Sequence, residues 1–291
     1  MKCKKVKQVK EPNSDNFHKF SCKIDIDKII KSQIGILNIG GSCYMASIIQ
    51  ILIHLKQFLE YFEKYRTLSP LSNKFSEFLQ KVENASNYSV EIRDLANTYY
   101  SINSKFKGTK GNNPMTFFIE FIKDLNPSIS TLFTGTKNIK INKGHNVIQN
   151  YDEKFIFHMV TIDKINPDID LVNENKKELE NDKNCIITEK LKVMPEILVI
   201  NLEIDNVDIN FEDYQTIPVV DLKNFYNYNL RGINRYTNFH SVSIIKIEDS
   251  WYKFDDYKCT KCNNMNDIFQ KSKYFNYVYN LFYEKGEPIE E

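Results

Sequence analysis

The two halves of this chain have different periodic patterns, and that switch constrains the fold more than any other feature of the sequence. Before Pro127 apolar residues recur at helical spacing, and after it short runs of β-branched and aromatic residues predominate. We expect helices over 42–65, 72–83 and 115–125, with Ser42 as the first N-cap. We expect strands over 154–162, 196–204, 240–247, 250–254 and 277–283, and a polar loop over 164–188. Helices followed by strands predict an α+β fold with a cleft where the halves meet.

Length, charge and cysteine usage narrow the class of protein. The chain has 291 residues, enough for one large domain, and residues 1–30 are expected to form an N-terminal tail with a short extended piece at its end. The formal net charge is +1, so we expect no overall attraction to nucleic acid or to a membrane surface. The six cysteines are spread thinly, and the basic N-terminus lacks the apolar core of a signal peptide. These features favour reduced thiols in the cytoplasm or nucleus.

The segment NIGGSCYMASIIQ, residues 38–50, places one cysteine in a setting suited to chemistry. Cys43 is expected in the first turn of a helix, where the positive end of the helix dipole favours a thiolate. Gly40 and Gly41 precede it and leave room for the backbone of a substrate. The side-chain amide of Asn38 is available to donate to an oxyanion beside the thiol. A nucleophilic cysteine is one interpretation, and a structural cysteine buried on an apolar helix is the other.

A thiol nucleophile needs a base, and the sequence FHSVSIIKIEDSWYKFDD, residues 239–256, offers one. If this segment is a hairpin that turns at 248–249, Val242 lies opposite Asp255, and His240 lies on the same face one diagonal step away. A carboxylate there would orient the imidazole and stabilise its protonated form. A slip of one residue would separate the two groups, and an exposed hairpin with incidental charges is the alternative. The histidines at 18, 54, 145 and 158 are expected to be structural or exposed.

Taken together, these segments resemble the ubiquitin-specific protease family of papain-like deubiquitinases. GILNIGGSCYMASIIQIL at 35–52 is similar to the family's cysteine box. His240 and WYKFDDYKC at 251–259 are similar to its histidine box. LKVMPEILVINLE at 191–203 and YNLFY at 279–283 look like two of its strands, and all of these matches occur in the family's order.

The resemblance implies a papain-like α+β fold and a reaction. It gives Cys43 as nucleophile, His240 as general base and acid, and Asp255 as the residue that orients His240. It gives Asn38 as an oxyanion donor and Asp256 as an assisting residue. Residues 31–291 would form one catalytic domain, with a helical thumb over about 33–125 and an antiparallel β palm with reduced fingers over about 126–291. The implied reaction is hydrolysis of the isopeptide or peptide bond at the C-terminus of ubiquitin, without a cofactor.

The sequence departs from the family pattern where the substrate would bind. NNPMTFF at 112–118 matches a segment that helps the family bind ubiquitin, but it lacks both acidic residues and keeps only Phe118. Phe239 and Ser241 replace the Gly and Tyr that flank the family's histidine. Altered recognition follows, so the alternatives are a protease for a ubiquitin-like modifier and a non-catalytic ubiquitin-binding scaffold. The expected substrate-binding residues are Gly40, Gly41, Phe118 and Phe239.

The cysteine pattern does not predict a metal site. Many relatives hold zinc through two CxxC pairs in the fingers region, whereas the matching region of this chain has a lone Cys185. A different pair, Cys259 and Cys262, follows the histidine box without a second pair. Because zinc in a structural site takes about four ligands, we expect these two residues to be reduced thiols near the sheet.

Overall fold

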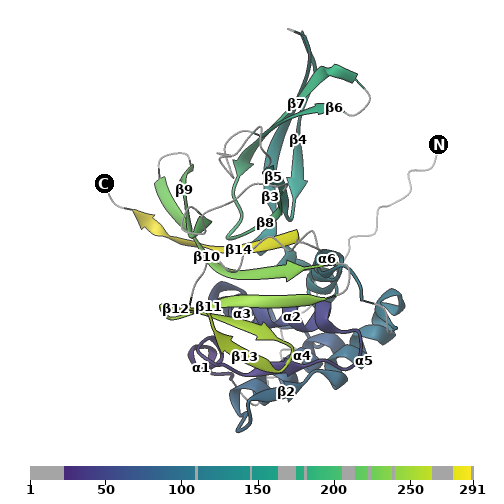
Figure 1. The fold of residues 1–291 in the computed structure, drawn as a ribbon, viewed down its shortest axis with the longest axis vertical. Helices are drawn as coiled ribbons and strands as arrows, with labels where there is room; N and C mark the ends of the chain where they lie inside the picture. Colours follow the sequence, from purple (N-terminus) through teal and green to yellow (C-terminus); the bar gives the residue numbers. More distant parts are fainter. Residues whose placement is uncertain are drawn as a thin grey trace, which may run out of the picture.

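The computed structural model in Figure 1 describes residues 23–108, 111–144, 146–162, 175–179, 182–204, 214–221, 224–237, 240–263 and 278–289. A layer of helices packs on an eight-stranded sheet, here called the main sheet, and a four-stranded projecting sheet extends away from the helices. The helices are α1 (Ile26–Ile30), α2 (Cys43–Leu52), α3 (Lys56–Tyr65), α4 (Pro70–Glu83), α5 (Arg93–Ile102) and α6 (Pro114–Leu125), with short 3-10 helices η2 (Ser104–Phe106) and η3 (Pro127–Phe133). Within the described residues, no helix is both long and apolar enough to span a membrane.

The strands form three groups. The main sheet has the order β13-β12-β11-β10-β14-β8-β5, with β9 paired to β10, and all of its pairs are antiparallel except β5 with β8. The projecting sheet has the order β4-β3-β7-β6, and β1 and β2 form a short parallel pair. The bounds are β1 (Gly35–Leu37), β2 (Ser89–Glu91), β3 (Gly135–Lys143), β4 (Asn146–Phe155), β5 (His158–Ile162), β6 (Asn175–Leu179), β7 (Asp182–Val193), β8 (Ile197–Ile204), β9 (Thr216–Asp221), β10 (Asn224–Tyr236), β11 (Ser241–Ile247), β12 (Ser250–Asp255), β13 (Lys258–Lys261) and β14 (Val278–Ile289).

The core lies on both faces of the main sheet. Alternate residues of its strands, such as Val199, Ile245 and Phe282, pack with the helices in one large cluster, the helix-side core. Their neighbours along the strands, such as Ile200 and Leu281, form a second cluster on the opposite face. This alternation is what a strand with two buried faces requires. Of the five strands predicted in this half of the chain, four are confirmed in type, and the fifth, 154–162, is divided at 156–157 between the end of β4 and β5.

The first predicted helix, 42–65, is two helices rather than one. A turn at 53–55 separates α2 from α3, although no glycine or proline marks the break. Leu55, the N-cap residue of α3, makes no side-chain cap. Instead the buried carboxylate of Glu284 on β14 accepts a hydrogen bond of 2.9 Å from the backbone N–H of Gln57. The carboxylate satisfies an unpaired donor and complements the helix dipole. The helix therefore begins where a strand far along the sequence caps it.

Two other helices agree with the sequence, and one expectation near the N-terminus is wrong. α4 and α6 confirm the helices predicted over 72–83 and 115–125. Residues 26–30, expected to belong to an extended tail, form α1 because the Asp25 carboxylate caps it, accepting 3.0 Å from Lys28 N. Ile29 of this helix is fully buried in the helix-side core. The residues from 24 onward therefore belong to the folded unit, and residues 1–22 lie outside the described residues.

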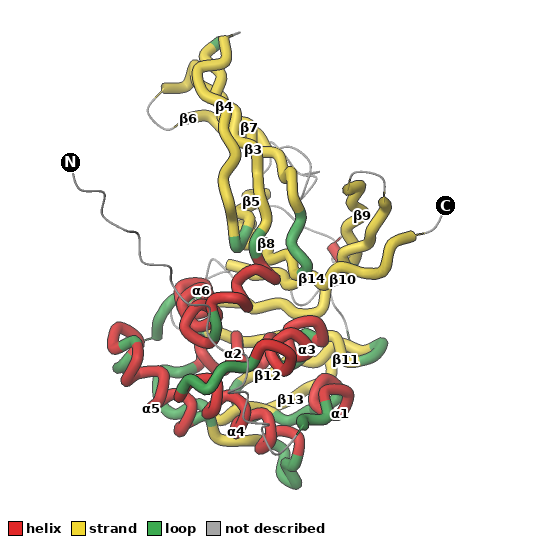
Figure 2. Tube along the Cα trace, turned by 180° about the vertical axis from the view of Figure 1, so that it is seen from behind, coloured by secondary structure: helices red, strands yellow, loops and turns green. Residues whose placement is uncertain are grey.

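The projecting sheet contains the largest error of the sequence-based prediction. Residues 175–179 and 182–188, expected in a polar loop, lie in β6 and β7. Figure 2, the view from behind, shows this sheet reaching well beyond the helices. Nearly every residue of β4 is exposed, and β3 buries only Gly135 and Ile139, so these two strands have no continuous buried face to impose an apolar–polar alternation. The sequence therefore lacks the usual strand signal, and the region still holds four strands.

The remote cap on α3 leads to a stability prediction. Glu284→Ala should lower the free energy of unfolding by about 1.5–3 kcal/mol, because it removes hydrogen bonds to a charged acceptor and leaves buried donors unpaired. Urea unfolding followed by circular dichroism measures this change. Glu287→Ala on the same strand is the control, since Glu287 is exposed and should change stability by less than about 0.5 kcal/mol. Equal losses in both variants would show that Glu284 does not cap α3.

Candidate active site

Cys43 is the first residue of α2, as the sequence predicts. The loop before it is shaped by Asn38, whose side-chain oxygen accepts hydrogen bonds from the backbone N–H groups of Gly40 (3.0 Å) and Ser42 (3.1 Å). Gly40 and Gly41 have φ angles of 89° and 66°, in the left-handed region that glycine adopts without steric cost. Ser42 occupies the N-cap position but makes no side-chain cap, and its hydroxyl donates to Asn38. This loop places the thiol at the positive end of α2.

His240 lies close enough to Cys43 for the two side chains to interact. The interaction with Cys43 is the largest influence on the imidazole and raises the pKa of His240 to about 9; burial opposes the shift, and Asp255 adds to it. An imidazole with that pKa is protonated at neutral pH, so a positive charge lies beside the Cys43 sulfur. Cys43 is 6% exposed, whereas 44% of the His240 side chain is exposed, so the pair opens to solvent on the histidine side.

The hairpin that holds His240 has the predicted register. Residues 248–249 form the two-residue turn, and Ser243 pairs with Phe254 as that turn requires. His240 Nε2 and Asp255 Oδ1 are 2.7 Å apart. The three groups singled out in the sequence therefore meet where α2 packs on β11.

A lysine that the sequence analysis did not single out also contacts the carboxylate of Asp255. Lys253 Nζ lies 3.0 Å from Asp255 Oδ2, while the other oxygen bonds to His240. Burial acts to raise the pKa of Asp255, but the hydrogen bonds from His240 and Lys253 outweigh it and lower that pKa. The carboxylate is therefore held ionised with both oxygens engaged. The signal in the sequence was the spacing of two residues, which puts Lys253 and Asp255 on one face of β12.

Asp256 has a different environment from its neighbour. Its Oδ2 accepts a hydrogen bond of 3.3 Å from the side-chain NH2 of Asn38. Its backbone has a φ of 53°, and its carbonyl oxygen accepts from Ile36 N at 3.2 Å, which ties the turn to β1. Burial raises the pKa of Asp256, and Asn38 partly offsets this effect. Asp256 thus contacts the loop before Cys43, whereas Asp255 contacts the histidine.

The structure agrees with the expected substrate-binding role for some of the four residues and not for others. Gly40 is exposed, with no atom within 4 Å of the place where a Cβ would lie, and Gly41 is half-buried, so the loop surface is open to a substrate. Phe118 is fully buried and packs edge-on against Phe133 and Phe282. The expectation that Phe118 contacts substrate is therefore wrong, because its ring belongs to the core. Phe239 lies outside the described residues.

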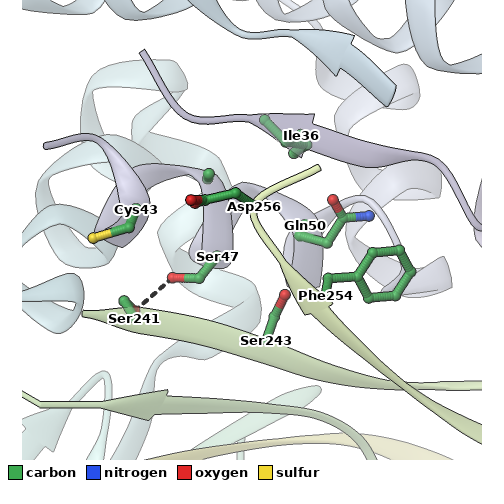
Figure 3. Close-up of a pocket in the computed structure, with 9 residues that line it drawn as sticks. Ile36, Cys43, Ser47, Gln50, Ser241, Ser243, Phe254 and Asp256 are labelled. Carbon is green, nitrogen blue, oxygen red and sulfur yellow. Dashed lines mark hydrogen bonds between the residues drawn. The ribbon is translucent and has the colours of Figure 1, made fainter. Parts of the chain in front are cut away.

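A small cavity of about 10 Å³ lies between α2 and the hairpin (Figure 3). Cys43, Ser47, Ser241 and Asp256 are among the residues that line it. Among the described residues, one group of three potential metal-ligating side chains occurs, His240, Asp255 and Asp256, with ligand atoms within 4.8 Å of one another. The hydrogen bonds of the site account for this cluster, since His240 bonds to Asp255 and Asp256 bonds to Asn38.

Within the described residues, the other cysteines and histidines lie away from these groups. Cys259 packs against the helix-side core and Cys262 against the opposite cluster, so the two thiols face different sides of the sheet. Burial raises the pKa of Cys259 to about 11, which makes it a poor nucleophile at neutral pH. His54 is buried, and its ring nitrogens contact the carbonyl oxygens of Gln50 and Ser32. His158 is buried in β5, and His18 and His145 lie outside the described residues.

Comparison with known proteins identifies the class that this fold and site define. The sequence model of the ubiquitin carboxyl-terminal hydrolase family matches residues 34–283, which is most of the chain. The chain therefore belongs to this family, and the resemblance seen in its sequence motifs is confirmed. No curated protein matches the chain in sequence.

Solved structures confirm the papain-like α+β fold. The chain is similar to the SAGA DUB module of Ubp8, Sgf11, Sus1 and Sgf73 bound to monoubiquitin, with a TM-score of 0.67 and 16% identity over 94% of this chain and 74% of that chain. It is also similar to the same module bound to ubiquitin aldehyde, with a TM-score of 0.65 and 16% identity over 90% and 71% of the two chains. Identity at this level shows a shared fold.

The contact between His240 and Asp255 leads to a prediction about the imidazole. Asp255→Asn should lower the pKa of His240 from about 9, because it removes a negative charge that stabilises the imidazolium. NMR titration of the His240 ring measures this pKa. Because the folded-state value lies above the ordinary 6.5, protonation of His240 stabilises the fold below about pH 6.5, and this contribution is lost as pH rises through about 9.

Asp249→Asn is the matched control for that titration, since Asp249 is an exposed residue of the same hairpin. It should leave the pKa of His240 near its original value. An unchanged pKa in Asp255→Asn would mean that the carboxylate does not stabilise the protonated ring.

Proposed function

We propose that the protein is a thiol-dependent hydrolase of the isopeptide or peptide bond at the C-terminus of ubiquitin. The observation that supports this proposal best is the continuous chain of contacts from Cys43 to His240 to Asp255 across the boundary between helices and sheet. A thiol, an imidazole and a carboxylate in that order are the groups that acyl transfer to sulfur requires. Membership of the ubiquitin carboxyl-terminal hydrolase family supports the class of substrate.

The proposed reaction has two stages. The Cys43 thiolate attacks the carbonyl carbon of the scissile bond, and His240 donates its proton to the departing amine as the carbon–nitrogen bond breaks. This leaves a thioester between the ubiquitin C-terminus and Cys43. Neutral His240 then takes one proton from water, which attacks the thioester, and the carbon–sulfur bond breaks to release the thiolate and a carboxylic acid, which loses its proton to solvent. Atoms and protons balance with substrate and water alone, so we propose no cofactor.

Asn38 is proposed as an oxyanion donor. Its amide oxygen accepts from the backbone of Gly40 and Ser42, which fixes the orientation of the amide. Its NH2 group has two protons, and one is directed to Asp256. The second is available to a developing oxyanion near Cys43. Asp256 would therefore assist by holding Asn38, while Asp255 orients His240.

The remaining parts of the proposal concern partners and location. Residues 31–291 are proposed as one catalytic domain whose partners are ubiquitin, or a ubiquitin-like modifier, and the proteins conjugated to it. We propose neither nucleic acid nor membrane as a partner. Thinly spread cysteines and an N-terminus without the apolar core of a signal peptide favour reduced thiols, so we place the protein in the cytoplasm or nucleus.

One observation favours a modifier other than ubiquitin as a second candidate. Pro114 and Phe117 occupy the positions where the family pattern has acidic residues, and both are buried. Phe117 packs against Tyr44 and Tyr99, with ring centroids 5.5 and 5.3 Å apart. This part of α6 therefore presents no carboxylate to a basic tail, and a modifier with a less basic C-terminal tail would suit it better.

Electrophilic probes test the proposed function directly. Purified protein is incubated with ubiquitin and with ubiquitin-like modifiers that each bear an electrophile at the C-terminus. We expect the ubiquitin probe to form a covalent adduct, seen as a mass shift, because the thiolate attacks the group at the scissile position. Cys43→Ala should abolish the adduct, and Cys262→Ala should not, since that thiol lies away from the site.

The probe experiment separates the candidates. An adduct with another modifier and not with ubiquitin would favour the second candidate. Binding of ubiquitin by wild type without any adduct would instead indicate a scaffold, and the proposed hydrolase activity would be refuted.

The two neighbouring aspartates are expected to differ in turnover. Asp255→Asn should lower kcat by roughly 10²–10⁴-fold, because an amide favours the wrong tautomer of His240 and does not stabilise the imidazolium. Asp256→Asn should lower kcat less, since it perturbs only the support of Asn38. Steady-state hydrolysis of a fluorogenic ubiquitin C-terminal amide measures both. A larger loss in Asp256→Asn would reverse the roles assigned here.

A further inference from the structure

Three asparagines lie side by side across the main sheet, on the side that faces the helices. Asn201 on β8 pairs in register with Asn280 on β14, and Asn280 pairs with Asn234 on β10. All three are buried, with at most 8% of each residue exposed. Their neighbours on the same side of these strands, Val199 and Phe282, are apolar members of the helix-side core. Burying an amide in such an apolar layer costs free energy unless the amide is hydrogen-bonded, so each of these side chains is expected to have hydrogen-bond partners.

The amides are joined head to tail in one direction. Asn201 donates to the side-chain oxygen of Asn280 at 2.6 Å, and Asn280 donates to that of Asn234 at 2.8 Å. The NH2 group of Asn234 then donates to Ser241 Oγ at 2.7 Å and to Ser47 Oγ at 3.0 Å. The carbonyl oxygen of Val242, 3.3 Å from the same nitrogen, is a third acceptor, and the two hydroxyls, themselves only 2.7 Å apart, lie in nearly the same direction from that nitrogen. The chain of hydrogen bonds thus runs from the middle of the sheet to the boundary between β11 and α2.

The two hydroxyls complete this chain. Ser47 donates to the carbonyl oxygen of Tyr44 at 3.1 Å. Because a hydroxyl has one proton, the 2.7 Å hydrogen bond between Ser47 and Ser241 must take its proton from Ser241. Ser47 Oγ therefore accepts two hydrogen bonds and donates one. Figure 3 shows this contact next to Cys43.

This series of hydrogen bonds ends beside both Cys43 and His240. Ser47 lies one turn after Cys43 on α2, and its acceptor Tyr44 directly follows the nucleophile. Ser241 directly follows His240. The helix lies close to the sheet here, because Gly232 on β10 has no side chain and a Cβ at that position would lie 2.8 Å from Ile51. The serine hydroxyls therefore form a buried polar contact between α2, which holds the thiol, and β11, which directly follows the imidazole.

We infer that this asparagine–serine chain sets the distance between Cys43 and His240, with Asn234 as the positioning residue. The inference rests on the proposed function and adds Asn234, Ser47 and Ser241 to the residues on which the reaction depends. Apolar packing between α2 and β11 permits small shifts, whereas a planar amide that bonds two hydroxyls fixes their separation and direction. A loss of alignment weakens the interaction between the Cys43 sulfur and the His240 ring, and hence the reactivity of the sulfur.

The test compares two serines of one strand. Ser241→Ala removes one hydroxyl of the asparagine–serine chain. Ser243→Ala removes a hydroxyl that is equally buried but has no hydrogen-bond partner among the described residues. The readout is the rate at which iodoacetamide alkylates Cys43 between about pH 5 and 10, followed by mass spectrometry of its peptide. Thermal unfolding of each variant shows whether the protein is folded at the assay temperature.

We expect Ser241→Ala to slow alkylation at neutral pH by roughly fivefold to tenfold, the size expected for one net hydrogen bond, and to move its midpoint to higher pH. Ser47→Ala and Asn234→Val should act in the same direction, while Ser243→Ala stays within about twofold of wild type. Ser241→Thr, which keeps the hydroxyl, should restore the rate. The inference is overturned if folded Ser241→Ala and Ser47→Ala match Ser243→Ala in both rate and midpoint.

Iodoacetamide is a small reagent that needs no recognition of ubiquitin, which keeps the two proposals separable. If the ubiquitin probes fail but the serine variants still differ in alkylation, the proposed function is refuted and the positioning role remains. If the probes react and the serine variants do not differ, the function remains and the positioning role is refuted.

Discussion

Burial of helix α2 against the main sheet is the constraint on which the rest of the site depends. All ten residues of this helix are buried, including Cys43 at its start. A helix covered on every side cannot move far without opening the core, so packing along the whole helix places the thiol to within small shifts. The same packing brings β11 and its preceding histidine to the N-terminal end of the helix. The reactive pair is thus a product of the interface between the two halves of the chain.

Positive and negative charges alternate along the contacts around that pair and compensate one another. A protonated His240 lies between the thiol and Asp255, and Lys253 neutralises the far oxygen of the same carboxylate. Asp256, whose pKa is raised by burial, is turned to the Asn38 loop instead. Two adjacent carboxyl groups therefore have opposite electrostatic environments, which is a common way for one site to separate roles between chemically identical groups. The positive φ of Asp256 accompanies the turn that directs them apart.

The candidate reacting groups and the start of α6 follow the family pattern to different extents. The thiol, imidazole and carboxylate lie together, whereas α6 buries Pro114 and Phe117 at the positions where the family pattern has acidic residues. Phe117 and Phe118 belong to an aromatic cluster that supports the helices beneath Cys43. The rings of these two residues therefore stabilise the packing of the helices. The projecting sheet, with solvent on both faces of β4, is a separate surface far from the start of α6.

Local features of the sequence determined the parts of the site that short-range geometry controls. A two-residue turn fixes hairpin register, so the pairing that brings His240 to Asp255 followed from the spacing of Glu248 and Asp249. The Gly40–Gly41 loop and the apolar run after it likewise placed Cys43 at a helix N-terminus. Only the tertiary structure decided the break between α2 and α3, the burial of Phe118 and the row of asparagines that reaches Ser47. Each of these depends on groups from distant parts of the chain, such as Glu284 capping a helix 227 residues away, and no local pattern encodes such a contact.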